Sequence, residues 1–246
     1  MAFRARQAGG VLARDNLTMS LRTNSARTSL VLRATACAVL AVAALAATAA
    51  GPPAADKPVA PINPDQNVHD RSQAEWSQAY LQWVAAFPRG SSPVSDTTGA
   101  LCGAKQDGDV WFLASSDGTA PVERRCAVPA GKTLFVPIAS VLERSGNREP
   151  DCAAMARVAS TNLTHVSAMS LSLDGKPVDD LAAYRQASGG CFALGARMLP
   201  RQDAKQAVSD GWFVLLPPLP AGAHAIVVQS RFDSTPVSTT WHLDVQ

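Results

Sequence analysis

The sequence lacks the short motifs by which many enzymes are recognised. It has no G-x-S-x-G elbow, no H-E-x-x-H pair, no G-x-x-x-x-G-K-[ST] phosphate loop, no G-x-G-x-x-G fingerprint and no EF-hand loop. Its four histidines are scattered, and none forms the H-x-H pair that a three-histidine metal site on one strand needs. These absences exclude several common enzyme classes, but a site assembled from distant residues would leave no such motif.

Clustered basic residues are also scarce once the N-terminal segment is set apart. Residues 1–50 hold six arginines and one aspartate, so the remainder carries 16 Lys and Arg against 19 Asp and Glu. Binding to nucleic acid or to a lipid surface needs clustered Lys and Arg. The composition therefore disfavours both partners.

The apolar run at residues 34–51 predicts a secretory leader. Arginines precede it, and the small residues Ala47-Thr48-Ala49 near its end form a cleavage signal. The run is short and mostly alanine, which disfavours a retained membrane anchor. We expect residues 1–50 to be a signal peptide, the mature chain to be secreted or periplasmic, and no integral membrane segment to remain. Met19 would open a conventional leader, so the alternative that residues 1–18 are not translated stays open.

Cysteine usage agrees with export. Cys37 lies in the leader, and the four remaining cysteines allow two disulfides in three possible connectivities. We expect the pairs Cys102–Cys126 and Cys152–Cys191, because each joins neighbouring segments. The spacings contain no C-x2-C pair, which disfavours a zinc site.

The mature chain begins with a Pro- and Ala-rich linker at 51–68, and residues 69–246 form a single domain. An aromatic stripe of helical period predicts a helix over 69–87, with Asn67 or Asp70 as its cap and Pro88 with Gly90 as its end. The stripe consists of Trp76, Tyr80, Trp83, Val84 and Phe87. It favours packing on a sheet over lining a ligand groove.

Beyond residue 108 the sequence pattern is typical of β-strands. Segments 109–114 and 121–128 flank the turn residues Ser115–Gly118 and predict a hairpin. A short helix is expected at 151–163 with Asp151 as its cap. Further strands are expected at 132–140, 166–173, 191–196, 212–216, 224–230 and 239–245. The pattern predicts a mainly β fold, an antiparallel β-sandwich that is jelly-roll-like, with an immunoglobulin-like sandwich as the alternative.

Three phrases are similar to those of a group of secreted bacterial β-rich proteins. They are QDGDVWFLASSDG, VERRCAVPAGKTLFVPI and DGWFVLLPPLPAGAHAIVV, and with a Trp-x6-Trp helix the resemblance spans about residues 76–230. The resemblance implies an exported bacterial β-rich domain. It brings no catalytic residues.

Arg124 is a candidate ligand-binding residue. Strand parity places it with Val122, Cys126 and Val128 on one face, and if that face is the core, the cation needs a carboxylate or several carbonyls. One interpretation is an anchor for an anionic ligand group such as a sugar acid. The favoured interpretation is a structural ion pair, for instance with Glu143 or Asp109.

Trp212 is the second candidate, because aromatic platforms on β-sandwiches bind sugars by stacking. It follows Asp210 and Gly211 near an expected strand start, where it would be partly exposed. His224 is expected to point inward or to the rim, and His242 and Asp244 to share a polar face. Carboxylate pairs in turns could hold a Ca²⁺ ion on the rim, although such pairs are not specific for it. They are Asp107/Asp109, Glu149/Asp151 and Asp179/Asp180.

These observations lead to three hypotheses. The leading one is an exported, non-catalytic binding or interaction domain whose ligand is a glycan, with Trp212, Arg124 and Asp210 as candidate contacts. The first alternative is a secreted hydrolase acting on polysaccharide or ester. The second is a structural envelope protein whose partners are other envelope or extracellular proteins.

Overall fold

The computed structural model describes residues 59–88, 90–118, 120–145, 149–195 and 206–246. The chain divides into two units between Pro52 and Pro53, and every described residue belongs to the second. The predicted signal peptide and the first part of the linker lie outside the described residues. In the ranges given, no helix is long and apolar enough to cross a membrane.

The described elements are two α-helices, one 3₁₀ helix and ten strands. In chain order they are α1 (Gln73–Ala85), β1 (Val110–Phe112), β2 (Val122–Val128), β3 (Thr133–Arg144), α2 (Cys152–Leu163), β4 (Val166–Leu173), β5 (Lys176–Pro177), η1 (Leu181–Tyr184), β6 (Arg185–Ala187), β7 (Phe192–Ala193), β8 (Gln206–Leu216), β9 (Gly222–Phe232) and β10 (Thr235–Val245).

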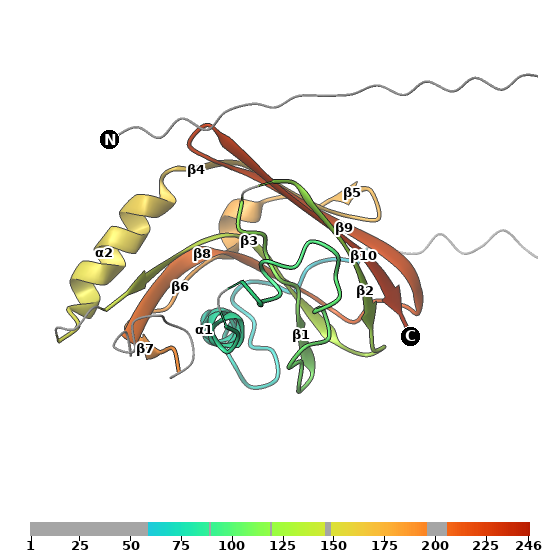
Figure 1. Cartoon of the computed structure of the whole chain (residues 1–246), viewed down its shortest axis with the longest axis horizontal. Coiled ribbons are helices and arrows are strands. Elements are labelled where there is room, and N and C mark those ends of the chain that lie inside the picture. The colour runs from blue at the N-terminus through green and yellow to red at the C-terminus, as the bar shows by residue number, and fades with distance from the viewer. Residues whose placement is uncertain (1–58, 89, 119, 146–148, 196–205) are drawn as a thin grey trace, which may run out of the picture. The chain divides into compact units, whose positions relative to one another are not determined.

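The strands form two sheets of mixed orientation (Figure 1). One has the order β1-β3-β8-β6, with β7 also paired to β8, and the other has the order β2-β10-β9-β4-β5. The pairs β1–β3 and β2–β10 are parallel, whereas the other pairs are antiparallel. The mainly β expectation is confirmed, but the purely antiparallel arrangement is wrong.

The predicted hairpin of β1 and β2 is also wrong. β1 pairs with β3 in the first sheet and β2 pairs with β10 in the second. The connection from Phe112 to Val122 carries the chain between sheets, so residues 115–118 belong to a crossing between sheets and not to a hairpin turn. Turn chemistry shows where a chain bends, but only tight two-residue loops fix which strands then pair.

Two apolar cores lie on the two faces of the first sheet. The core between the sheets takes alternate residues of β8, such as Val214 and Leu216, together with Ile226 and Trp241 of the second sheet. The other core lies beneath α1, where Tyr80 contacts Phe135 and Phe213. Because side chains alternate along a strand, β8 is buried on both faces and supplies both cores.

Helix α1 starts later than the sequence predicts. Its N-cap is Ser72, whose hydroxyl accepts from the amide of Glu75 while the Glu75 carboxylate accepts from the amide of Ser72. This reciprocal capping box satisfies two amides at the helix start. Asp70, proposed as a cap, instead lies in the preceding turn with φ of 62°. The linker residues that the structure describes pack on the domain, with the Ile62 amide donating to the Leu215 carbonyl (2.8 Å).

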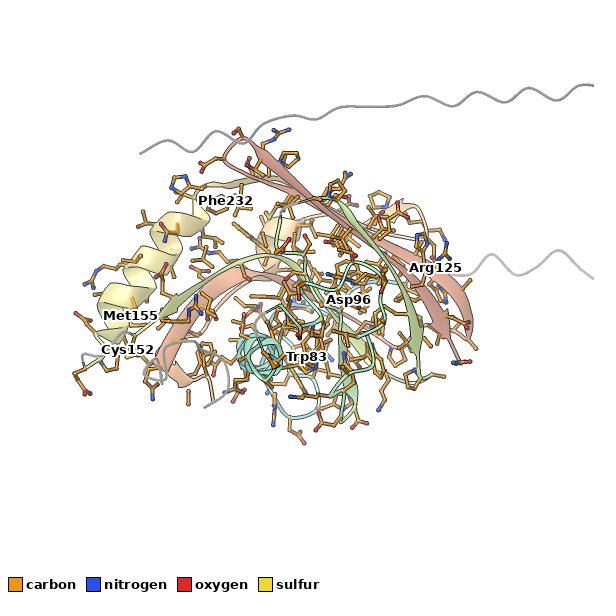
Figure 2. All side chains as sticks on the ribbon, viewed as in Figure 1. Trp83, Asp96, Arg125, Cys152, Met155 and Phe232 are labelled. Carbon is orange, nitrogen blue, oxygen red and sulfur yellow. A yellow bond between two sulfur atoms is a disulfide. The ribbon has the colours of Figure 1, made fainter. Side chains whose placement is uncertain are left out.

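The expected disulfides are both present, Cys102–Cys126 and Cys152–Cys191. The first attaches the loop before β1 to β2, and the second joins the start of α2 to the segment before β7. Asp151 caps α2 as predicted, accepting from the amide of Ala154 at 2.8 Å. Figure 2 shows Cys152 and Met155 on α2, at one end of the two sheets.

Gly211 packs closely against β3 and generates a stability prediction. A Cβ atom there would lie 2.5 Å from Cβ of Ser140 and 2.6 Å from the carbonyl oxygen of Ala139, next to the irregular register of β3. Gly211→Ala should therefore lower the free energy of unfolding by at least about 2 kcal/mol, measured by urea denaturation. Gly190→Ala is the control, because no atom lies within 4 Å of its added Cβ. Equal stability of both variants would contradict the assigned close packing.

A candidate binding groove beside helix α1

A hollow of about 660 Å³ lies beside α1 and β1. It is lined by the turn before the helix, one side of the helix and the segment that leads into β1. Small-molecule sites are typically hollows of roughly 300–1,000 Å³ with an apolar floor and a few polar groups. This groove has both, as its individual residues show.

A strained turn forms one end of the groove. Val68 and Arg71 bridge each other through two main-chain hydrogen bonds, and the residues between them, His69 and Asp70, have φ of 47° and 62°. Two consecutive residues with positive φ inside such a bridge are typical of a type I′ turn. Non-glycine residues in this conformation are strained, and such strain gathers at functional sites. The turn places His69 and Arg71 on the groove.

The floor of the groove is aromatic. Trp76 is half-buried, its ring lies 6.2 Å from that of Phe112, and its indole N–H donates to the Val68 carbonyl (2.8 Å). The Arg71 guanidinium lies 5.0 Å from the centre of the same ring. Trp83, labelled in Figure 2, is buried and donates to the Ala104 carbonyl (3.0 Å). The aromatic stripe of α1 therefore packs on the sheet and, at Trp76, also borders the groove.

The rim carries both signs of charge. His69 Nδ1 lies 3.9 Å from a carboxylate oxygen of Asp109, and Asp107 lines the same side. On the same segment, Lys105 donates to the Ala86 carbonyl (2.6 Å) and lies over the Phe87 ring (4.7 Å). An aromatic floor with nearby donors and acceptors suits a ligand that has apolar faces and several hydroxyl groups.

Arg124 lies away from this groove and is 1% exposed. Its guanidinium donates to the carbonyls of Asp96 (2.6 Å), Val94 (3.1 Å), Ser115 (3.1 Å) and Ala114. The proposed ion-pair partners lie elsewhere: Glu143 accepts from Asn162, and Asp109 faces His69. Burial lowers the pKa of Arg124, and the nearby Tyr80, Asp96 and Asp117 act in the opposite direction.

Asp210 and Trp212 lie together on β8, where Asp210 is buried and Trp212 is half-buried. Strand β8 begins six residues before Trp212, so this residue sits mid-strand and half-buried. Asp210 is 5% exposed and receives two hydrogen bonds from Arg185, at 2.9 and 2.6 Å. The Asp210 carboxylate raises the pKa of Arg185, and the guanidinium lies 5.9 Å from the Trp212 ring centre.

The remaining histidines each face a carboxylate. His165 contacts Asp233 (2.7 Å), His224 contacts Asp174 (2.8 Å), and His242 lies 3.6 Å from Glu123. Trp241 and Leu243 are core residues, so His242 and Asp244 share the outer face as expected. In the part of the chain that the structure describes, no three His, Cys, Asp or Glu side chains are grouped to hold a metal ion.

Sequence reasoning missed His69 and Lys105 on the groove and Arg185 on Asp210. Two signals pointed towards the groove, namely the aromatic stripe of α1 and the pair Asp107/Asp109. No pattern in the sequence links Arg185 to Asp210, because strand pairing alone brings β6 beside β8.

Comparisons with known proteins add little. No protein-family model matches the chain, and no curated protein matches it significantly. Among solved structures, PbICP-C in complex with falcipain-2 is 12% identical with a TM-score of 0.27, over 56% of this chain and 100% of that chain. A protein from Bacteroides thetaiotaomicron, solved by NMR, is 10% identical with a TM-score of 0.22, over 54% and 83%. Scores this low carry no argument about fold or function.

The carbonyl cluster around Arg124 generates the second prediction. Arg124→Met leaves four buried or half-buried carbonyls without their donor, so the free energy of unfolding should fall by about 3 kcal/mol in urea denaturation. The matched control is Arg125→Met, since Arg125 is exposed on the opposite face of β2 (Figure 2). A stable Arg124→Met protein that had lost binding to an acidic ligand would instead support a ligand-anchoring role.

Proposed function

We propose that the mature chain is an exported, sandwich-like binding domain that holds a glycan in the groove beside α1. The observation that carries the proposal is the half-buried Trp76 beside a mixed-charge rim, within a hollow large enough for a small saccharide. Sugar rings present apolar faces to indoles and hydroxyl groups to charged side chains. On this proposal Trp212 is a secondary contact, because its side chain packs against the core between the sheets.

The export part of the proposal is supported by the two disulfides. Disulfides persist in the periplasm and outside the cell, whereas cytosolic proteins rarely keep them. The leader predicted at residues 1–50 and the resemblance to secreted bacterial proteins support the same location. A jelly-roll-like topology remains the finer proposal for the two facing sheets.

A hydrolase is the second candidate, because the groove contains a histidine and two carboxylates. His69 and Asp109 face each other at 3.9 Å, and Asp107 lies on the same rim. General acid–base chemistry on a glycosidic bond uses two carboxyl groups placed on either side of it. The binding proposal needs fewer conditions, since it requires no defined spacing between these groups.

The test is a thermal-shift screen of the disulfide-bonded chain against neutral and acidic mono- and oligosaccharides. A ligand that binds the folded state stabilises it by about 2.7 kcal/mol at a hundred times its Kd. We expect one sugar class to raise the melting midpoint. His69→Gln and Trp76→Phe should weaken that binding about tenfold, the loss of one good contact worth about 1.4 kcal/mol.

The matched control is His242→Gln, because His242 also lies near a carboxylate but outside the groove. It should bind as the wild type does. Release of shorter sugars during incubation would assign the hydrolase activity. Absence of any shift across the panel would contradict the glycan proposal and favour a structural envelope role.

A further inference from the structure

A second hollow, of about 410 Å³, lies at another part of the domain, and His224 lines it. The imidazole lies near the start of β9 and is only 13% exposed. One of its nitrogens faces the turn after β4 and the other faces the proline-rich segment before β9. His224 therefore links two segments that are far apart in the sequence.

Both contacts of the ring are with oxygen acceptors. Nδ1 lies 2.8 Å from Oδ2 of Asp174, and Nε2 lies 2.9 Å from the carbonyl oxygen of Pro220. A neutral imidazole carries one N–H, so it can donate to only one of these oxygens and must turn a lone pair towards the other. Only the protonated ring donates to both.

Asp174 is held firmly in place for this contact. Its other carboxylate oxygen accepts from the Ala225 amide (2.8 Å), and its own amide donates to the Ala225 carbonyl (2.8 Å). Its φ of 51°, followed by Gly175 at 75°, forms the tight turn between β4 and β5. The carboxylate therefore cannot turn away without losing its hydrogen bond from the Ala225 amide, and a neutral ring that donates to Asp174 turns a lone pair towards the Pro220 carbonyl.

We propose that His224 is a proton-operated latch. In its protonated form it ties the turn at Asp174 to the segment around Pro220, and loss of the proton releases the Pro220 carbonyl and loosens the wall of the second hollow. The proposal does not depend on the glycan proposal, because the two hollows share no residue.

The groups around the His224 imidazole favour its protonated form. Burial is the largest single influence and lowers the pKa of His224, but the hydrogen bonds to Asp174 and Pro220 outweigh it and leave the pKa above its ordinary value. The other titratable groups on the hollow are Lys176, Asp179 and Tyr184. On β10 the residue opposite His224 is the uncharged Leu243.

A raised histidine pKa sets the direction of the pH dependence. Below about pH 6.5 the ring is protonated in both the folded and the unfolded chain, and the stabilisation is fully present. As the pH rises, the unfolded chain loses its proton first. The stabilisation then declines until the pH has passed the raised pKa of the folded chain.

The decisive experiment follows the disulfide-bonded chain through a pH titration by NMR and by thermal unfolding. We expect His224 to titrate above pH 6.5, with the amide resonances of Ala225 and Leu219 moving at the same midpoint. His224→Gln should lose this pH-dependent part of the melting midpoint. His165→Gln should keep it, because His165 also pairs with an aspartate but is 47% exposed.

Asp174→Asn provides the sharpest variant. Its amide can donate to Nδ1, so a neutral ring can keep both links, and the pH dependence should disappear while the fold remains. Titration of His224 at or below its ordinary range, or a His224→Gln profile that matches the wild type, would overturn the latch. Should either variant fail to fold, the wild-type titration alone decides.

Discussion

The guanidinium of Arg124 organises the side of the domain on which the two sheets are connected. It donates to carbonyls from the loop before β1 and from the connection after β1, so one β2 side chain joins three segments. Within that loop, the Asp96 carboxylate accepts hydrogen bonds from the amides of Thr98, Gly99 and Leu101. The Cys102–Cys126 disulfide then closes the loop onto β2. The segment from Cys102 to β1 forms one wall of the groove beside α1. The position of this wall therefore depends on the buried Arg124 guanidinium.

The local parts of this arrangement could be predicted from the sequence. Strand β4 has the predicted bounds, Asp151 caps α2, and parity correctly places Arg124 on one face of β2 with Val122, Cys126 and Val128, a face that is buried. These features depend on neighbours within a few residues, because side-chain alternation and capping are local rules. The cysteine pairing also followed from segment proximity. The face that carries Arg124 could be predicted from strand parity, but the carbonyls that accept its hydrogen bonds could not.

Long-range pairing could not be predicted in the same way. The parallel contact of β1 with β3 and the salt bridge of Arg185 with Asp210 arise only when the sheets are assembled. The groove is a similar case. The aromatic stripe of α1 indicated a buried face, but the position of Trp76 at its border depends on the 68–71 turn and on Phe112. A periodic pattern in the sequence does not predict contacts between segments that are distant in sequence. Functional sites are commonly built from such contacts.

The parallel pairing of β2 with β10 has a consequence for the order of folding. Val122 pairs with Thr239 and Val128 with Val245, and the Gln246 carbonyl accepts the Ala130 amide. Both ends of the β2 ladder therefore depend on β10, which follows far later in the sequence. During synthesis β2 must wait without this partner until β10 has been made, and such non-local pairing slows folding. The second sheet therefore closes late, because its β2 ladder is incomplete until β10 has been made.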